Sequence, residues 1–188
     1  MKACIMLAAG FSSRMGAWKM LLPWRKKTVL DSALRNALGF CDRVILVTGY
    51  RAEELHQRYA GWPAVQLCYN ANYPSGMFSS VRCGAAALSG EHFFVVPGDM
   101  PAIDARIYAR LWQHRGSRCL LPRYAGRNGH PVLLPGTMAT HIMAAPESST
   151  LRTLMQDFGC ASLPVDSPAI HWDLDTPEQY QQRLGNAC

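Results

Sequence analysis

The first residues that could do chemistry lie in a glycine-rich loop after the first apolar run of the chain. Residues 7–19 read LAAGFSSRMGAWK and combine glycines with hydroxyl and basic side chains. Gly10 and Gly16 would let backbone amides approach an anion, and Arg14 and Lys19 would add positive charge. The loop therefore favours phosphate binding. It matches neither G-x-x-x-x-G-K-[ST] nor G-x-G-x-x-G, so an ordinary kinase, GTPase or dehydrogenase is not supported.

Aspartates form a second set of candidates. Asp99 follows a buried apolar run in VVPGDMP, whereas Asp104 directly precedes ARIYARLW and is the better helix cap, which leaves Asp99 freer to bind a metal. Asp173 and Asp175 alternate in residues 169–175, which we expect to be a strand, so both would face the same way. Asp175 precedes Thr-Pro, and capping of the final helix is as plausible for it as metal binding. Mg²⁺ takes one or two carboxylates with phosphate oxygens and water, which Asp99 and Asp175 would supply.

Alternating apolar runs and helical patterns must position these residues. The patterns predict strands over 3–9, 43–49, 64–70, 92–101 and 118–122, with helices over 28–39, 51–60, 77–88 and 104–115. The second half adds a loop leading into a strand over 127–135, one or two helices within 137–157, short strands over 161–166 and 169–175, and a closing helix over 176–184 with Pro177 at its first helical position. This order predicts an α/β fold, a Rossmann-like arrangement of three layers with a mostly parallel sheet, as a single domain over residues 1–188.

Five loops are expected to meet at one edge of that sheet, because ligands in such folds bind beyond the carboxyl ends of the strands. They are the glycine-rich loop, NANYPSGMFSS, GDMP, RNGHP and DLDTP. Gly76 precedes a helix whose amides could face a phosphate or a base. For Asn70, Gly76 and Ser80, ligand contact and a structural role are equally open. For His130 we favour ligand contact over a surface-loop role.

Composition narrows the class of protein. The 188 residues are 49% apolar with a net charge of +6, which fits an anionic ligand. The basic run from Arg25 to Lys27 is expected to be a solvated turn, and no DNA or RNA module is recognisable, so nucleic acid is not expected as a partner. No window approaches the ~18 apolar residues of a membrane span, and a buried first strand explains the early apolar run better than a signal peptide.

The cysteines indicate the compartment. There are seven of them, with wide spacings and without a C-x-x-C pair, which argues against both a disulfide framework and a zinc site. We expect a cytoplasmic protein in which most cysteines are reduced and buried. Cys188 would be an exposed thiol in the tail.

The motifs together resemble one family. LAAGFSSRMGAWK, GMFSSV, GDMP, GHP and DLDTPEQY occur in the order found in the MobA-like nucleotidyltransferases, and the resemblance covers essentially the whole chain. Within the family, the chain looks most like the members that transfer a cytidylyl group to the molybdenum cofactor. The resemblance implies transfer of CMP from CTP to the terminal phosphate of Mo-molybdopterin, with Mg²⁺ as cofactor, release of pyrophosphate, and a molybdenum hydroxylase as a candidate client of the product.

The resemblance also implies roles for residues by position. Arg14, Lys19 and Asp99 would be catalytic, and Asp99 and Asp175 would hold the metal. His130 matches a segment near the acceptor. The Ala8–Ala9 pair stands where guanylyl-transferring relatives tend to have Ala-Gly, so the methyl group of Ala9 would narrow the base pocket and disfavour a purine. The nucleotide-binding set implied by the motifs is Leu7, Ala8, Ala9, Gly10, Ser12, Arg14, Lys19, Asn70, Gly76 and Ser80.

The chemistry agrees with the motifs that the sequence lacks. A phosphate monoester has a second pKa near ~6, so an acceptor phosphate is already ionised at neutral pH and needs no general base. The sequence has no Ser-His-Asp pattern and no H-E-x-x-H. Two alternatives remain: a nucleotidyltransferase that uses another NTP or a sugar phosphate, and a chaperone that binds the molybdenum cofactor without catalysis. Gly10, Arg14, Lys19 and Asp99 together argue against the chaperone.

Overall fold

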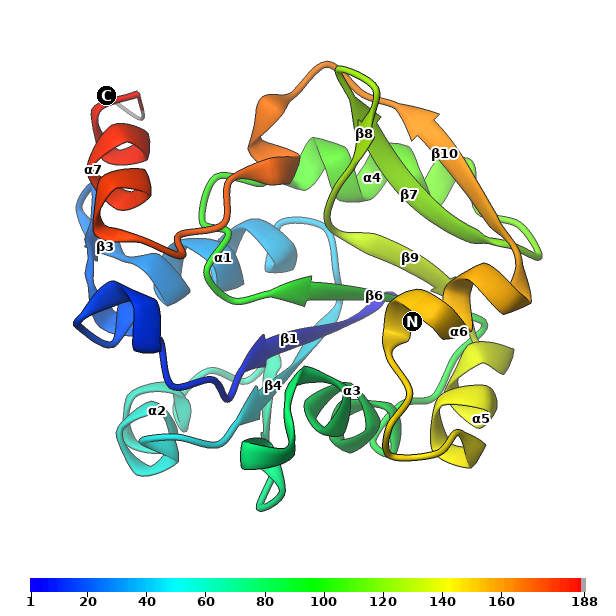
Figure 1. Ribbon diagram of the computed structural model, residues 1–188, viewed down its shortest axis with the longest axis horizontal. Helices are drawn as coiled ribbons and strands as arrows, with labels where there is room; N and C mark the ends of the chain where they lie inside the picture. Colours follow the sequence, from blue (N-terminus) through cyan, green and yellow to red (C-terminus); the bar gives the residue numbers. More distant parts are fainter. Residues whose placement is uncertain (187–188) are drawn as a thin grey trace.

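The computed structural model describes residues 1–186, in which helices cover both faces of a mixed β-sheet (Figure 1). Cys188, expected to be a thiol in the tail, lies outside the described residues. The strands are β1 (Ala3–Ala8), β2 (Pro23–Trp24), β3 (Lys27–Thr28), β4 (Arg43–Thr48), β5 (Val65–Tyr69), β6 (His92–Pro97), β7 (Cys119–Tyr124), β8 (Arg127–Asn128), β9 (Val132–Pro135) and β10 (Cys160–Pro164).

The helices mostly match the predicted ranges. They are α1 (Val29–Leu38), α2 (Ala52–Tyr59), α3 (Met77–Ala85), α4 (Ala105–Gln113), α5 (Thr137–Ala144), α6 (Leu151–Phe158) and α7 (Pro177–Gly185). Helix α3 ends three residues earlier than predicted. Short 3₁₀ helices cover Ser13–Met15, Lys19–Leu21, Tyr73–Ser75 and Pro168–His171. No helix within residues 1–186 combines the length and the apolar character that crossing a membrane requires.

The main sheet has the strand order β10-β7-β9-β6-β1-β4-β5, with β8 paired to β7. Strand β1 lies between β4 and β6 and is parallel to both, and β4–β5 and β7–β10 are also parallel pairs. Strand β9 runs antiparallel to β6 and β7. The expected mostly parallel α/β fold is therefore confirmed, and β9 is a reversal that the strand patterns did not indicate.

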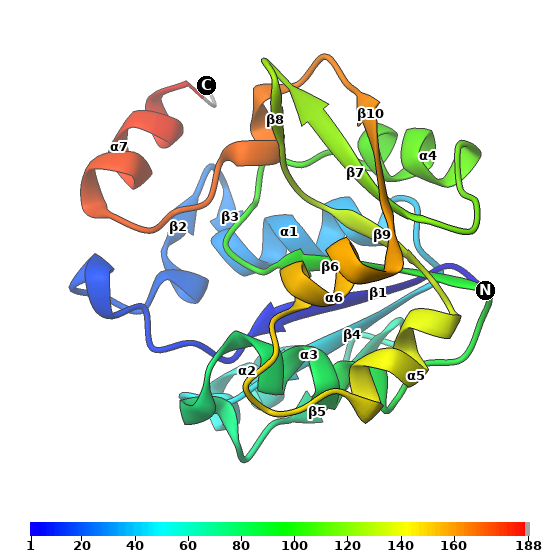
Figure 2. The same ribbon diagram turned by 45° about the vertical axis from the view of Figure 1, so that its right-hand side comes forward.

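Two apolar layers lie on opposite faces of the sheet. Side chains of β1 alternate between them: Cys4 and Met6 pack in one layer, while Ile5 and Leu7 pack in the other. The first layer is covered by α1, α2 and α4, and the second by α3, α5 and α6 (Figure 2). All six residues of β1 are buried, which explains its continuous apolar run.

Hydrogen bonds from side chains start the helices as their sequences indicate. Thr28 and Asp31 form a capping box at α1, and Asp104 accepts a hydrogen bond from the amide of Arg106 at α4. At α7 the cap is Thr176, with Pro177 at the first helical position. The alternative that Asp175 caps α7 is therefore wrong, and its carboxylate is left for other contacts.

The predicted strand over residues 169–175 is absent. Pro168–His171 forms a 3₁₀ helix, and residues 172–175 join no sheet. Their polar backbone groups have other partners: the amide of Trp172 donates to the carbonyl of Ala169, and that of Asp175 donates to the side chain of Gln179. The argument that strand alternation makes Asp173 and Asp175 face the same way therefore does not hold.

A small hairpin and the last helix close one end of the molecule. Strands β2 and β3 pair antiparallel around the exposed residues Arg25 and Lys26, as expected for a solvated turn. Tyr180 of α7 packs with Met15 and Trp24 in a separate apolar cluster, which places α7 beside the hairpin (Figure 1). The start of α7 is thereby brought next to the glycine-rich loop.

Candidate active site

A cleft of about 1010 Å³ lies where the five predicted loops meet. The turn after β6 contributes Asp99, and the glycine-rich loop contributes Gly10, Ser12, Ser13, Arg14 and Lys19. The other three loops, NANYPSGMFSS, RNGHP and DLDTP, contribute Met77, His130 and Asp175, respectively. The expectation that these loops gather at one edge of the sheet is confirmed.

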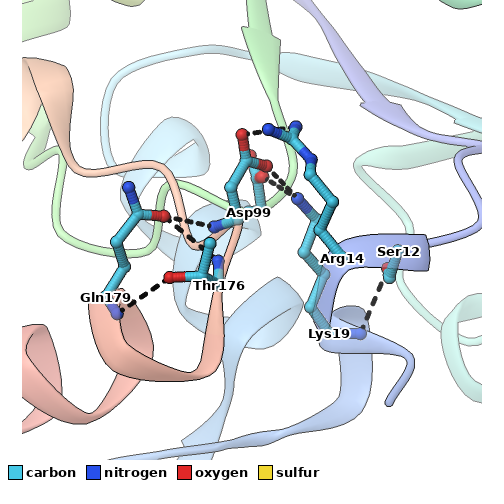
Figure 3. A network of polar contacts seen from close by, with 7 residues as sticks. Ser12, Arg14, Lys19, Asp99, Thr176 and Gln179 are labelled. Atoms are coloured by element: carbon cyan, nitrogen blue, oxygen red, sulfur yellow. Dashed lines mark hydrogen bonds and ion pairs between the residues drawn. The ribbon is translucent and has the colours of Figure 1, made fainter. Parts of the chain in front are cut away.

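Lys19 is at the centre of the charged end of this cleft. Its ammonium group contacts the carboxylate of Asp99 and lies 2.9 Å from Oδ1 of Asp175 (Figure 3). The side chain of Lys19 is only 13% exposed. Burial by itself would lower the pKa of Lys19, but Asp99 and then Asp175 raise it above the ordinary 10.5. Lys19 therefore remains charged at neutral pH.

Arg14 reaches the same cluster from the other side of the loop. Its guanidinium donates a hydrogen bond of 2.7 Å to Oδ2 of Asp175 (Figure 3). In contrast to Lys19, its side chain is 71% exposed, so it is free to turn toward a ligand in the cleft. Both cations therefore lie on the first loop, where the sequence predicts the binding of an anion, and both are paired with carboxylates.

The glycine-rich loop is held in shape by its own backbone. Ser12 has a φ of 56° and Gly16 a φ of 67°, and the amide of Met15 donates to the carbonyl of Ser12. The hydroxyl of Ser12 also accepts a hydrogen bond of 3.3 Å from the amide of Lys19. Ser12 therefore positions Lys19. At Gly10 an added Cβ would meet no atom within 4 Å, so that glycine leaves open space in the cleft.

Three carboxylates face the cleft with different environments. Asp99 is nearly buried, and its Oδ1 has no hydrogen-bond partner. Burial, together with the charges of Asp175 and Asp99, raises the pKa of Asp173. Burial also acts to raise the pKa of Asp175, but Lys19 and Arg14 outweigh it and lower that pKa. The ionised form of Asp175 is therefore stabilised by its two cations, whereas the neighbouring Asp173 binds its proton more tightly than an ordinary aspartate.

The cap of α7 positions Asp175. The side-chain oxygen of Gln179 accepts hydrogen bonds from the amides of Asp175 and Thr176, at 2.9 and 3.1 Å. The hydroxyl of Thr176 accepts one from the amide of Gln179 (Figure 3). These bonds orient the turn so that the carboxylate of Asp175 points at Lys19.

Asp99 and Asp175 could supply some, but not all, of the ligands that a divalent cation needs. No group of three or more His, Cys, Asp or Glu in residues 1–186 is arranged as a metal site. Mg²⁺, however, needs only one or two carboxylates when phosphate and water complete its shell. The unpartnered buried oxygen of Asp99 and the nearby carboxylate of Asp175 provide that donor set, so these residues fit Mg²⁺ with a phosphate ligand.

His130 lines the cleft, and the charge of Asp99 acts on its ring. Its backbone amide donates to the carbonyl of Ile170, and its Nδ1 is buried without a hydrogen-bond partner. Burial lowers the pKa of His130, so the ring is neutral at neutral pH. Gly129 holds this loop close to Ile170, because an added Cβ would collide with the carbonyl of Ile170.

Helix α6 supplies a wall of the cleft that sequence reasoning missed. Arg152 and Gln156 provide polar groups there, beside the apolar side chains of Leu151 and Met155. Their helical pattern was visible, but nothing in it distinguished a cleft wall from a solvent-exposed face. Arg127 and Asn128 also line the cleft; they belong to the RNGHP loop expected at the site, although the sequence assigned them no role.

Other predicted nucleotide-binding residues lie outside the lining of the cleft. The side-chain amide of Asn70 donates to Ser79 and Ser80, at 2.9 and 3.0 Å, and its oxygen accepts from the amide of Asn72. These bonds join the end of β5 to α3. Gly76 is the N-cap of α3 and has a φ of 107°, a conformation that favours glycine. A ligand-binding role for Asn70, Gly76 and Ser80 stays a prediction.

The residues that precede the glycine-rich loop are buried. Leu7, Ala8 and Ala9 are at most 9% exposed. Ala9 packs close to Gly49, where an added Cβ would lie 2.9 Å from the methyl group of Ala9. Their role in binding the nucleotide also remains a prediction.

Comparison with known proteins gives a family match. A model of the MobA-like NTP transferase domain matches residues 4–171. The molybdenum cofactor cytidylyltransferase of Escherichia coli (strain K12) is 39% identical over 177 residues, which cover 94% of this chain and 92% of that protein. The molybdenum cofactor guanylyltransferase of Pseudomonas fluorescens (strain SBW25) is 30% identical, with 96% and 92% covered.

The fold is shared with solved structures. A nucleotidyl transferase from Methanothermobacter thermautotroptrophicus superposes with a TM-score of 0.85 at 21% identity, over all of this chain and 97% of that chain. At this identity the likeness concerns the fold alone. It agrees with the element order and the mixed sheet described above.

Proposed function

The chain belongs to the MobA-like NTP transferase family, and from that membership we infer that it transfers CMP from CTP to the terminal phosphate of Mo-molybdopterin. The products would be the molybdopterin cytosine dinucleotide cofactor and pyrophosphate. The similar cytidylyltransferase, at 39% identity over nearly the whole chain, supports CTP over the GTP implied by the name of the guanylyltransferase at 30%.

The observation that carries the proposal is the contact of Lys19 with Asp99 and Asp175 at the edge of the cleft. A reaction between two phosphate groups must overcome the repulsion of two anions. Lys19 and Arg14 would bind the triphosphate and offset its charge. Phosphate oxygens compete with Asp99 and Asp175 for these two cations, so nucleotide binding frees carboxylate oxygens.

The freed carboxylates would hold Mg²⁺. Asp99 is the main ligand in this proposal, since its Oδ1 is buried and has no other partner. Asp175 is the second ligand, held in place through Gln179. When bound, the cation neutralises charge on the phosphate oxygens and holds them in a fixed orientation. A cofactor-binding chaperone would need neither these carboxylates nor the cations beside them.

The acceptor would enter along the wall formed by His130 and α6. Its phosphate needs no base, because a phosphate monoester is already ionised at neutral pH. The neutral ring of His130 therefore serves to position the acceptor and does not remove a proton in this proposal. Transfer of the finished cofactor to a molybdenum hydroxylase would follow release from the cleft.

Nucleotide binding tests the proposal. CTP, GTP, ATP and UTP are titrated in parallel by calorimetry with Mg²⁺, using the native chain and the D99A variant. D104N is the matched control, because Asp104 caps α4 outside the cleft and Asn is an equally good cap. The proposal predicts that CTP binds best, that binding depends on Mg²⁺, and that D99A alone loses this dependence.

Two results would change the conclusion. Preference for another nucleotide would keep the reaction class and overturn the product. Failure of a folded protein to bind any of the four would favour the chaperone.

A further inference from the structure

Two cysteines outside the cleft lie in direct contact. Cys68 is in β5 and Cys83 is in α3, and their sulfur atoms are 3.0 Å apart. The bonded distance in a disulfide is about 2.05 Å, so a small movement of the two side chains would join them. The same thiols also contact backbone carbonyls, those of Cys83 and Tyr69, each at 3.6 Å.

Solvent reaches this pair. Both side chains are half-buried, and β5 is the edge strand of the main sheet. Two other cysteine pairs lie close together, and in each at least one thiol is fully buried: Cys4 with Cys41, and Cys119 with the half-buried Cys160. Cys4 and Cys41 are 0% and 4% exposed, and burial followed by the contact with Cys41 raises the pKa of Cys4. A reagent in solution can therefore reach Cys68 and Cys83 but not Cys4 and Cys41.

We propose that Cys68 and Cys83 are a modification site, at which a reversible disulfide forms by exchange with a low-molecular-weight disulfide such as oxidised glutathione. This proposal goes beyond the proposed transfer reaction and does not depend on it. Disulfides in reducing compartments, where they occur, are usually transient and redox-sensing, which suits a pair at an accessible edge.

The exchange proceeds in two balanced steps. The thiolate of Cys68 attacks one sulfur of the small disulfide, which forms a mixed disulfide and releases one thiolate. Cys83 then loses its proton to solvent, attacks the sulfur of Cys68 and releases the second thiolate. Two protein thiols are oxidised to one disulfide, and the small disulfide is reduced to two thiols.

Cys68 is the thiol that attacks first. Burial, followed by the hydrogen bond with Cys68, raises the pKa of Cys83 to about 12, so Cys83 is protonated at neutral pH and acts second.

The bond would link two elements that are already joined by hydrogen bonds. Asn70 lies two residues after Cys68, and it binds Ser79 and Ser80 in the same helix that carries Cys83. A disulfide adds a covalent link at this junction and closes the segment that contains Gly76. Helix α3 begins at Met77, which lines the cleft, so oxidation would restrict one border of the cleft.

The test uses the full chain in its reduced, folded form. It is incubated with mixtures of oxidised and reduced glutathione, and remaining thiols are alkylated before intact-mass and peptide mapping. We expect a product that has lost two hydrogen atoms, with Cys68 and Cys83 in one cross-linked peptide pair, and full reversal by a dithiol reductant. Cys4 and Cys41 should be alkylated only after unfolding, which makes them the internal control.

Single variants separate the two steps. C83S should stop at a glutathione mixed disulfide on Cys68, and C68S should form no internal cross-link. The proposal is overturned if both thiols stay reduced in the folded native chain, if a mixed disulfide persists there, or if the cross-link joins other cysteines. The native chain alone decides these outcomes, so the test stands even if a variant fails to fold.

Discussion

The ammonium nitrogen of Lys19 lies 2.9 Å from Oδ1 of Asp175, which joins two residues 156 positions apart in the chain. This ion pair fixes the glycine-rich loop against the turn before α7. Both groups are largely withdrawn from water, with side-chain exposures of 13% and 22%. When the nucleotide binds, Lys19 would pair with the triphosphate in place of Asp175. The carboxylate of Asp175 would then be available to the divalent cation.

Loss of either central charge should impair catalysis. Lys19→Ala and Asp99→Ala are each expected to reduce turnover by at least about 10²-fold, because groups that stabilise transition-state charge typically contribute about 10²–10³-fold. Steady-state release of pyrophosphate measures the effect. Asp104→Asn should leave turnover unchanged. Near-normal turnover of a cleft variant would remove that residue from its assigned role.

A methyl group at position 10 should block the nucleotide without disturbing the fold. An added Cβ at Gly10 meets no protein atom within 4 Å, so Gly10→Ala should have the same unfolding temperature as the native chain. CTP affinity should fall at least about tenfold, or ~1.4 kcal/mol, because the methyl group occupies space meant for the phosphates. Gly61→Ala, equally open but outside the cleft, is the control. Unchanged affinity in Gly10→Ala would place the triphosphate elsewhere.

Removal of the methyl group of Ala9 should relax nucleotide selection. Ala9 is buried against Gly49 at the start of the loop. On the expectation that its methyl group borders the base pocket, a Gly there would open space for a larger base. One methylene in a pocket changes discrimination about 10- to 200-fold, so the ratio of kcat/KM for CTP to that for GTP should fall by at least about tenfold in Ala9→Gly. An unaltered ratio would show that selectivity resides in other residues.

Asp173 and Asp175 should affect stability with opposite signs. The raised pKa of Asp173 means that its contribution to the free energy of unfolding is complete at low pH and is lost as the pH rises through the folded-state pKa. The lowered pKa of Asp175 gives a contribution that is present above the ordinary value of 3.8 and is lost as the pH falls through the folded-state pKa.

The two Asn variants make this measurable by urea unfolding without divalent cations. At neutral pH, Asp173→Asn should be more stable than the native chain and Asp175→Asn less stable. The Asp173→Asn difference should shrink as the pH falls through the raised folded-state pKa of Asp173 toward 3.8, whereas the Asp175→Asn difference should shrink only as the pH falls below 3.8. Equal effects of the same sign would contradict the environments described for these two carboxylates.

Much of the fold could be read from local pattern. The fully buried run of β1 and the capping residues Thr28 and Asp104 specify their elements through short-range physics that a sequence displays directly. The segment over 169–175 could not be read in this way. Its alternation resembles a strand, but it pairs with no strand within residues 1–186, and its backbone forms hydrogen bonds with turns and with Gln179 instead.

Site residues within recognisable motifs could be predicted from the sequence. Residues that only tertiary packing brings to the site could not. Glycines and charges marked Arg14, Lys19 and Asp99, yet only the fold brings Asp175 within 2.9 Å of Lys19. Arg152 was missed because an amphipathic helix gives no sign of which neighbour its polar face meets. Asn70 shows the converse, since a polar residue in a promising loop turned out to bond mainly within the protein.

Cytidylyl transfer is measured most directly as pyrophosphate release with purified Mo-molybdopterin, Mg²⁺ and either CTP or GTP, with the product identified by mass. We expect rapid release with CTP that requires the acceptor, and a product that carries one added CMP. Faster release with GTP, or CTP turnover without any change in the mass of the acceptor, would contradict this expectation.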